Sequence, residues 1–496
     1  MDLILDGNGP LYLQVVRALK DAINSGRLPN GMRLPSSREL CAELGVSRTT
    51  VVAAYEHLHA EGLIRGKVGS GSYVTSPRTA PSRPQAACIG VLPQSDFSRR
   101  SRQVFDIADL PGRRPLGMRH AFQFGLPMVN PRLSVLWARE LARAAPYVRP
   151  EYPSVQGLPA LREAICRHIN RSRGVMCTPD DILIVNGAQQ AFSLISRVLL
   201  DPGEAVVIEE PHYHGVRKIL QIHGARLCPV AVDANGLRTA GLPDPAAKLV
   251  IVTPSHQFPT GAVLSLERRR ALLDYARSAG TWICEDDYDG EFRSENAPVQ
   301  ALQAMDRDGR VLYVGTFSKT LFPSLRLGYI AMPPALKQDL LAAKWADDFG
   351  SSPAEQAALA RIISSGAYDR HLRLVTRHLA ERRGLLQRLL QGFCGNAIDV
   401  RPAHTGMHLV AWIRSMPRAE GEAFIRFALE RQLALYPVDP CYLTPPDGTG
   451  LIMGFSAMSV REMHQAVRLF SDTLAAFAGS RPTPAVRSVP SRSTAG

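Results

Sequence analysis

The sequence of 496 residues contains no apolar run that approaches the roughly 18 residues of a membrane span. Its first residues include the acids Asp2 and Asp6 where a secretory signal needs bases, and no long apolar stretch follows. We therefore expect no membrane partner and a cytoplasmic location. The 45% hydrophobic and 21% charged content is that of an ordinary globular protein, which excludes collagen-like and wholly disordered chains.

Cysteine is also sparse. The eight cysteines are widely scattered, and no two of them form a Cys-x-x-Cys pair. Neither a zinc site nor a disulfide framework is expected, and we interpret the cysteines as reduced thiols. The formal net charge is +13, which permits binding to nucleic acid but does not by itself identify a partner.

Composition divides the chain into four zones. Residues 1–75 are regular and compact, whereas residues 76–118 are rich in Pro, Ser and Arg and predict an extended, flexible linker. The arginines of this linker suit DNA phosphates, although a solvated linker is the simpler interpretation. Residues 119–478 form one large region, and the proline-containing tail 479–496 is expected to be disordered.

Local signals in the first zone predict three helices and a hairpin. Apolar residues recur at helical spacing over residues 11–23. Ser36 and Glu39 have the spacing of a capping box, and Ser47 is placed to cap a third helix. Two short strand-like runs then flank a glycine-rich tip at residues 66–71. This order is typical of a winged helix-turn-helix.

The recognition helix of such a domain would begin at residues 47–50, where hydroxyl groups and one arginine suit phosphates and base edges. The zone holds eight bases and seven acids, so bulk charge does not favour DNA over the alternative of an interaction module that never touches it. The candidate DNA-contacting residues are Arg38, Ser47, Arg48, Thr49, Thr50, Arg65, Lys67 and Gly69.

Four stretches of this zone resemble the GntR-type DNA-binding domain. They are PLYLQ at residues 10–14, GMRLPSSREL at 31–40, LGVSRTTV at 44–51 and GLI at 62–64. The resemblance covers nearly all of residues 9–75. It implies that the chain binds double-stranded operator DNA.

Five apolar runs of buried-strand length alternate with helical segments in the large region. The runs are residues 181–185, 205–208, 249–252, 281–284 and 311–314. This alternation predicts an α/β fold with a mostly parallel sheet. Because ligands of such sheets bind beyond the carboxyl ends of the strands, the residues that follow each strand carry most of the information.

Three of these segments carry chemistry. Residues 186–189 open a helix whose N–H groups suit a phosphate, although a plain strand-to-helix turn has the same appearance. Four acids surround Tyr288, which fits either a metal site or a solvated loop. Lys319 follows a buried strand, is flanked by hydroxyls and precedes Arg326, a pattern that suits a Schiff base beside a phosphate.

The joint pattern resembles the type I fold of pyridoxal-phosphate (PLP) aminotransferases over about residues 120–478. The resemblance rests on TPSHQFPTG at residues 253–261, EDDYDGEFR at 285–293 and GTFSKT at 315–320. Fused behind a GntR-type domain and a linker, such a region is similar to the MocR/GabR subfamily of transcriptional regulators. The fold expected is therefore a winged helix-turn-helix followed by a large aminotransferase-like α/β domain.

The resemblance implies a role for each matching residue. Lys319 would form the internal aldimine with PLP. Asp286 would pair with the pyridine nitrogen and keep the ring an electron sink, with Glu285 and Asp287 as the alternatives. Tyr288 would bond the 3-hydroxyl and Tyr213 would stack on the ring.

The phosphate group of PLP would be held by a further set of residues. The resemblance implies that this set comprises Gly187, Ala188, Gln189, Thr316, Ser318 and Arg326. Tyr152 is similar to a tyrosine that reaches the phosphate of the neighbouring subunit, which implies a homodimer.

Two positions depart from the aminotransferase pattern. Ile452 stands where an arginine usually clamps the substrate carboxylate, and an apolar side chain makes no such clamp. His214 lies near the place where the GABA-sensing type uses an arginine. The departures count against efficient transamination and against GABA as the ligand, and they leave Arg217, His214 and His256 as alternatives for an acidic effector.

The sequence therefore predicts a PLP-dependent transcriptional regulator that senses PLP itself, or a small amine or amino acid, at Lys319. An active aminotransferase with an accessory N-terminal domain is the main alternative. A repressor whose large domain serves only for dimerisation is the third, and the intact Lys319 and Asp286 argue against it.

Overall fold

The computed structural model describes residues 3–67, 71–75, 94–105, 114–128, 130–292, 300–400 and 406–479. Its contacts divide the chain into two units, Met1–Gln94 and Ser95–Gly496, which are described in turn. Gly69 and the predicted tail beyond Gly479 lie outside the described residues. Among the helices of the described ranges, none is long and apolar enough to cross a membrane.

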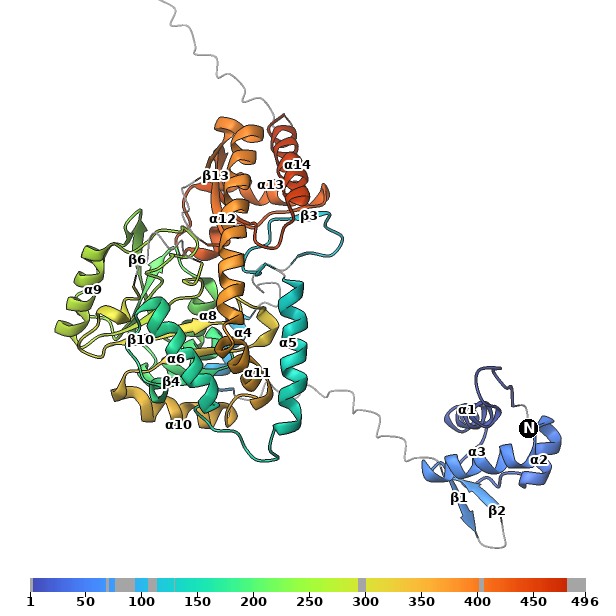
Figure 1. Cartoon of the computed structure of the whole chain (residues 1–496). Coiled ribbons are helices and arrows are strands. Elements are labelled where there is room, and N and C mark those ends of the chain that lie inside the picture. Colours follow the sequence, from blue (N-terminus) through green and yellow to red (C-terminus); the bar gives the residue numbers. More distant parts are fainter. Residues whose placement is uncertain are drawn as a thin grey trace, which may run out of the picture. The chain divides into compact units, whose positions relative to one another are not determined.

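The N-terminal unit contains three helices and a two-stranded antiparallel hairpin (Figure 1). The elements are α1 (Leu11–Asn24), α2 (Ser37–Leu44), α3 (Arg48–Ala60), β1 (Ile64–Lys67) and β2 (Gly71–Val74). This is the predicted order of a winged helix-turn-helix.

Capping residues set the boundaries of its helices as the sequence predicts. Ser36 and Glu39 form a reciprocal capping box at the start of α2. The Ser47 hydroxyl accepts a hydrogen bond from the backbone N–H of Thr50 at the start of α3. Between the two helices Gly45 has a φ of +65°, a left-handed conformation that a residue with a Cβ adopts only at a cost.

The large unit is built on an eight-stranded sheet of order β4-β11-β10-β9-β8-β5-β6-β7. The strands are β4 (Ile182–Val185), β5 (Ala205–Glu210), β6 (Arg226–Asp233), β7 (Gly236–Leu237), β8 (Leu249–Val252), β9 (Trp282–Asp286), β10 (Val311–Thr316) and β11 (Gly328–Ala331). All five predicted strands are present. The pairs from β10 through β6 are parallel, and β11 and β7 run antiparallel to their neighbours.

Helices cover both faces of this sheet (Figure 1). One face packs on α7 (Ala188–Leu199), α8 (His214–His223) and α10 (Lys337–Asp348). The other packs on α6 (Pro159–Arg173), α9 (Leu266–Ala279), α11 (Pro353–Ser364) and α12 (Ala367–Cys394). Since both faces are covered, the strands are continuous apolar runs such as ILIV in β4, in which every residue is buried.

A smaller C-terminal part packs beside the large sheet. Its three-stranded antiparallel sheet joins β12 (Ile398–Val400), β13 (His408–Pro417) and β15 (Gly448–Gly454). The remaining elements are α5 (Pro131–Ala144), α13 (Arg418–Glu430), α14 (Val460–Gly479) and the short parallel pair β3 (His120–Ala121) and β14 (Leu433–Ala434). Figure 1 shows α12 running from the layer of the large sheet to α13 and α14.

Of the predicted linker 76–118, the structure describes residues 94–105 and 114–118, and part of the first stretch is helical. Within it, Asp96–Val104 forms a helix, α4, that packs on α8. The Ser95 hydroxyl accepts a hydrogen bond from the N–H of Ser98, and the Phe97 ring packs edge-on against His223. Phe97 and Val104 lie two helical turns apart in an otherwise polar stretch. This pattern is too sparse to predict a helix, and the contact with α8 lies outside the local sequence.

Candidate functional site

A cavity of about 130 Å³ lies where the predicted cofactor residues come together. Eight of those residues line it, and they are Ala188, Gln189, Tyr213, Asp286, Tyr288, Thr316, Lys319 and Arg326. They follow or end the strands β4, β5, β9 and β10 on one edge of the sheet. This is the edge at which parallel α/β sheets bind ligands.

Lys319 reaches the cavity from the segment after β10. Its Nζ donates a hydrogen bond of 2.9 Å to the backbone carbonyl oxygen of Gly125. Burial lowers the pKa of the Lys319 amine, which favours the neutral, nucleophilic form. Gly125 has a φ of +78°, and a Cβ on it would lie 3.1 Å from Nζ. The close approach of lysine and backbone therefore requires glycine there.

Asp286 ends β9 with its carboxylate toward the same cavity. No group in the described part of the chain donates a hydrogen bond to its buried Oδ1. Burial, with the nearby charges of Asp287 and Asp289, raises the pKa of Asp286 to about 8. A buried carboxylate without a donor is costly, so the position suits a ligand that brings an N–H or a positive charge.

The two neighbouring acids are already engaged elsewhere. Arg173 contacts Asp287 at 2.7 Å, and the Tyr313 hydroxyl donates a 2.6 Å hydrogen bond to the same carboxylate. The carboxylate of Glu285 accepts two hydrogen bonds of 2.8 Å, one from the backbone N–H of Leu302 and one from that of Gln303. Of the three consecutive acids only Asp286 lines the cavity, as the role implied for it requires.

Tyr288 is held by a histidine. The Nδ1 of His256 lies 2.9 Å from the Tyr288 hydroxyl and 2.9 Å from Oδ2 of Asp289. Burial raises the pKa of Tyr288, so its hydroxyl keeps its proton. The same environment includes His408, whose pKa burial lowers to about 4. The tyrosine is thereby fixed as a neutral hydrogen-bonding group at the cavity wall.

The start of α7 has features that suit an anion. Gly187 precedes the helix with a φ of +81°, and the first N–H groups of a helix have no partner within it. Arg326 donates a 2.8 Å hydrogen bond to the backbone oxygen of Asn186. The Thr316 hydroxyl contacts Ser318, which does not itself line the cavity. An arginine, a hydroxyl and a helix N-terminus together suit a phosphate.

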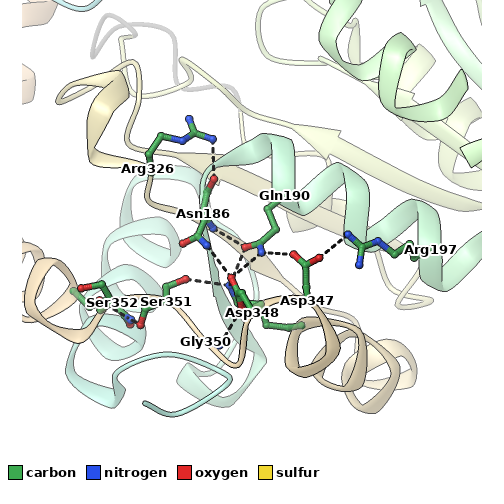
Figure 2. A network of polar contacts seen from close by, with 11 residues as sticks. Asn186, Gln190, Arg197, Arg326, Asp347, Asp348, Gly350, Ser351 and Ser352 are labelled. Carbon is green, nitrogen blue, oxygen red and sulfur yellow. Dashed lines mark hydrogen bonds and ion pairs between the residues drawn. The ribbon is translucent and has the colours of Figure 1, made fainter. Parts of the chain in front are cut away.

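Figure 2 shows a network of polar contacts behind this turn. The Nζ of the fully buried Lys344 lies 2.8 Å from Oε1 of Gln190, 2.8 Å from Oδ2 of Asp348 and 3.0 Å from Oγ of Ser351. The side-chain amides of Gln190 and Asn186 each donate a 2.8 Å hydrogen bond to Asp348 Oδ2. The turn before α7 is thereby tied to the end of α10.

Tyr152 lies outside the cavity of its own chain. Its side chain is 86% exposed, and its ring packs 5.5 Å from that of Phe349, which contacts Trp345 at 5.3 Å. All three aromatic side chains are exposed. The role implied for Tyr152 on a neighbouring subunit stays a prediction.

The carboxylate clamp is absent at the position where an aminotransferase would place it. Ile452 lies on β15, is buried and packs in an apolar cluster with Phe124 and Phe258, which line the cavity. This wall offers no charge to a carboxylate.

The three side chains considered as binding groups for an acidic effector have different surroundings in the structure. Arg217 donates a 2.9 Å hydrogen bond to the backbone oxygen of Tyr442 and therefore holds the fold. His214 lines a groove outside the cavity, together with Lys319 and Arg326. His256 is occupied at Nδ1 as described above.

The N-terminal unit presents most of the predicted DNA-contacting residues to solvent. Arg38, Ser47, Arg48, Thr49 and Arg65 are exposed, and Thr50 is half-buried. The hydroxyls of Thr49 and Thr50 lie 2.8 and 2.7 Å from that of Ser47. Lys67 belongs to β1, and Gly69 falls outside the described residues. These contacts with DNA stay a prediction.

Two family models match the chain. "Bacterial regulatory proteins, gntR family" matches residues 11–74, and "Aminotransferase class I and II" matches residues 133–468. The "Probable rhizopine catabolism regulatory protein MocR" of Rhizobium meliloti is 34% identical, with 97% of each chain covered. The "HTH-type pyridoxine biosynthesis transcriptional regulator PdxR" of Corynebacterium glutamicum is 30% identical, covering 80% of this chain and 82% of that protein.

The chain is a member of the MocR subfamily of GntR-type transcriptional regulators.

Aminotransferases are among the solved structures similar to this MocR-subfamily chain. The α-aminoadipate aminotransferase LysN of Thermus thermophilus has a TM-score of 0.66 at 25% identity, with 78% of this chain and 96% of LysN covered. The kynurenine aminotransferase of Pyrococcus horikoshii has a TM-score of 0.67 at 23% identity, covering 76% and 98%. The second likeness shows the fold alone.

Sequence reasoning missed several residues of the site in this MocR-subfamily chain. The further lining residues are Phe124, Gly125, Phe192, Phe258, Met407 and His408. Most of them belong to segments far along the chain from the strand ends that were expected to carry the site. No motif or residue spacing therefore pointed to them. Phe258 belongs to the motif at residues 253–261 on which the resemblance rests. A further clue is Gly125 in FQFG at 122–125, because an isolated glycine in such a stretch marks a close approach of backbone.

Proposed function

We propose that this regulator binds operator DNA as a homodimer through its winged helix-turn-helix, and that its large unit senses PLP, or a small amine or amino acid that reacts with PLP. The observation that carries the proposal is that Lys319, Asp286 and Arg326 line one cavity beside the start of α7. A sensor that binds its ligand in one state more tightly than in another shifts the balance between those states.

The residues of the cavity fit PLP. The buried Oδ1 of Asp286, which receives no hydrogen bond from the described residues, suits the N–H of a protonated pyridine ring. Tyr213 offers an aromatic face, and the Tyr288 hydroxyl suits the ring 3-hydroxyl. Ala188, Gln189, Thr316 and Arg326 suit the phosphate. When bound, PLP supplies an aldehyde carbon that forms a reversible C=N bond with a primary amine.

The protein's own groups prepare that chemistry. Burial lowers the pKa of Lys319 and so raises the share of its amine that is neutral and nucleophilic. With PLP bound, Asp286 would face the ring nitrogen as a carboxylate and would keep that nitrogen protonated. Phe124 and Phe258 line the cavity, and Ile452 packs in the same apolar cluster, so this side disfavours water.

The exposed aromatic side chains of Tyr152, Trp345 and Phe349 support self-association. They pack against one another on the surface at the end of α10. Exposed aromatic clusters mark protein interfaces, and a second copy would bring its Tyr152 to this face. Two winged helices in one dimer suit repeated half-sites in DNA.

Reduction with borohydride tests the cofactor proposal. Protein stripped of PLP is incubated with PLP, reduced, digested and examined by mass spectrometry. A phosphopyridoxyl group on the peptide that contains Lys319 is expected, and its loss in Lys319→Ala. Lys344, which is buried in another network, is the internal control. Label on other lysines alone, or none, contradicts the proposal.

Transaminase turnover is the second function to measure on the same samples. Lys319 and Asp286 favour it, and the apolar Ile452 opposes it. Multiple turnovers at the rate of an ordinary enzyme, about 1 s⁻¹ or faster, would make catalysis the main function.

A further inference from the structure

Asn186, the residue before the glycine turn that opens α7, is held by three contacts. Its backbone N–H donates a 2.8 Å hydrogen bond to Oε1 of Gln190, and its side-chain amide donates one of 2.8 Å to Oδ2 of Asp348. Its carbonyl oxygen accepts the 2.8 Å hydrogen bond from Arg326. Figure 2 shows Asn186 between Arg326 on one side and Asp348 on the other. The arginine that lines the cavity is therefore joined to the network through Asn186.

The turn itself has little to fix its conformation. Gly187 has no side chain and a φ of +81°, and a glycine has many other conformations open to it. The peptide that joins Asn186 to Gly187 carries the carbonyl oxygen that Arg326 contacts. The contacts of Asn186 therefore set the orientation of this peptide, and with it the place where the guanidinium of Arg326 is held.

Asp348 is the acceptor on which these contacts converge. Its Oδ2 accepts hydrogen bonds of 2.8 Å from the side chains of Asn186, Gln190 and Lys344. Its Oδ1 accepts one of 2.9 Å from the backbone N–H of Gly350. A carboxylate has about four acceptor sites, so this one is fully used. Burial would raise the pKa of Asp348, but hydrogen bonds from Gln190 and Lys344 lower it overall, which keeps the carboxylate charged.

The backbone is strained at both ends of this chain of contacts. Arg326 has a φ of +53°, and Phe349, which follows Asp348, has a φ of +58°. They are two of the three non-glycine residues with a positive φ in the described part of the chain. Such a conformation is costly for a residue with a Cβ, and it persists where surrounding contacts impose it, often at ligand clamps. Its presence at both ends favours a role of the network in geometry over a role in stability alone.

We propose that Asp348 is a positioning residue for the phosphate of PLP, and that it acts through Asn186 by fixing the peptide whose carbonyl oxygen holds Arg326. The proposal rests on the proposed function, which supplies the ligand. Asp348 is not among the described residues that line the cavity, and its own negative charge would repel an anion. Its contribution to phosphate binding therefore comes from geometry, and the effects of geometry and of charge have opposite signs.

The test compares two ligands that differ by the phosphate group. Full-length protein stripped of PLP is titrated with PLP and with pyridoxal, and the absorbance of the bound chromophore gives both dissociation constants. The ratio of the pyridoxal constant to the PLP constant measures the contribution of the phosphate. In Asp348→Ala this ratio is expected to fall about tenfold, because only PLP binds more weakly. Loss of the charge alone would instead raise the ratio, because PLP would bind more tightly.

Asp347→Ala is the matched control. Asp347 precedes Asp348 on α10 and carries the same charge, but it contacts Gln190 at 2.6 Å and Arg197 at 2.7 Å. Its replacement removes one negative charge and leaves the hydrogen bond between Asn186 and Asp348 in place. Because Asp347 is exposed and its charge is screened, the ratio is expected to stay within about twofold of that of wild type.

Asn186→Ala removes the link and keeps the ion pair of Lys344 with Asp348. It therefore decides the question even if Asp348→Ala fails to fold, and it is expected to lower the ratio about tenfold as well. In the double variant the loss is expected to be no larger than in the more affected single variant, because the two residues act along one path. Additive losses would contradict an action of Asp348 through Asn186.

Two further outcomes would overturn the proposal. One is a ratio that stays unchanged or rises in Asp348→Ala and Asn186→Ala. The other is an equal weakening of PLP and pyridoxal, which a merely structural role of the network would produce. Failure of the wild-type protein to take up PLP at Lys319 would instead refute the proposed function, so the two failures are distinguishable.

Discussion

The guanidinium of Arg326 donates a hydrogen bond of 2.8 Å to the backbone carbonyl oxygen of Asn186. This bond fixes a permanent positive charge beside the turn that opens α7. Gly187 lies close to the guanidinium: a Cβ on Gly187 would be 3.0 Å from Nη2 of Arg326. We expect the arginine and the turn to bind the phosphate of PLP together.

Replacing Arg326 tests that expectation. Arg326→Gln removes the charge, and we expect the dissociation constant for PLP to rise at least about tenfold. Arg326→Lys keeps a charge but loses the forked geometry, so an intermediate loss is expected. Titration of stripped protein with PLP, followed by absorbance, measures both. Equal affinity in all three proteins would show that the phosphate binds elsewhere.

Removal of Lys344 is expected to weaken the network behind the turn (Figure 2). Lys344→Met leaves Asp348 and Gln190 without their shared cation, and breaking such a buried pair costs about 3 kcal/mol. Urea unfolding of the stripped protein measures the loss. Lys248→Met is the matched control, since Lys248 makes only a 3.8 Å surface pair with Glu204, and its expected change is below about 1 kcal/mol. Similar losses in both variants would contradict the account.

The pH dependence of stability reports on Asp286. Its pKa is raised to about 8 in the folded protein from 3.8 in an unfolded chain. The folded state therefore holds a proton that the unfolded state has lost, and this contribution to stability declines as pH rises from about 4 to 8. Asp286→Asn removes the dependence.

Unfolding free energies of stripped wild type and Asp286→Asn are compared between pH 5 and 8 in roughly unit steps. Wild type is expected to lose at least about 1.4 kcal/mol relative to the variant, the equivalent of one pKa unit. Parallel curves would mean that Asp286 is ionised in the folded protein. PLP is expected to reduce the difference, because the ring nitrogen brings a positive charge.

Gly125 tests the close approach of backbone and lysine. Gly125→Ala adds a Cβ 3.1 Å from Nζ of Lys319, on a residue with a φ of +78°. Gly203→Ala is the matched control, because Gly203 has a φ of +94° and a Cβ there meets nothing within 4 Å. Both variants are expected to lose stability through backbone strain. Only Gly125→Ala is expected to slow covalent PLP uptake, as followed by absorbance; equal uptake in the two would refute the contact.

The sequence predicts the parts of this protein that depend on local signals. The capping box at Ser36, the five buried strands and the polar residues after their ends all have a period or a spacing, and the structure contains each of them. The remaining residues that line the cavity could not be predicted from local signals. Gly125 and His408 reach it from segments distant in the chain, and only the fold brings them together.

The helix α4 illustrates the same limit. Its apolar residues are only Phe97 and Val104, two turns apart, and Phe97 contacts His223 of α8. Composition predicted a linker because composition does not record tertiary contacts. The resemblance selected Asp286 among three adjacent acids, and the physical reason lies in tertiary contacts, since Glu285 and Asp287 are bound by other groups.

Operator affinity with and without PLP tests the central claim most directly. Footprints and titrations on the DNA upstream of the protein's own gene and its neighbours would be made at one stated salt concentration. Wild type, Lys319→Ala and Arg48→Ala are compared, each stripped and PLP-loaded. The account predicts protected repeats in wild type, a change in affinity of at least about fivefold on adding PLP, loss of that change in Lys319→Ala and weak binding in Arg48→Ala. Specific protection that PLP leaves unchanged, or no specific protection in either form, would contradict it.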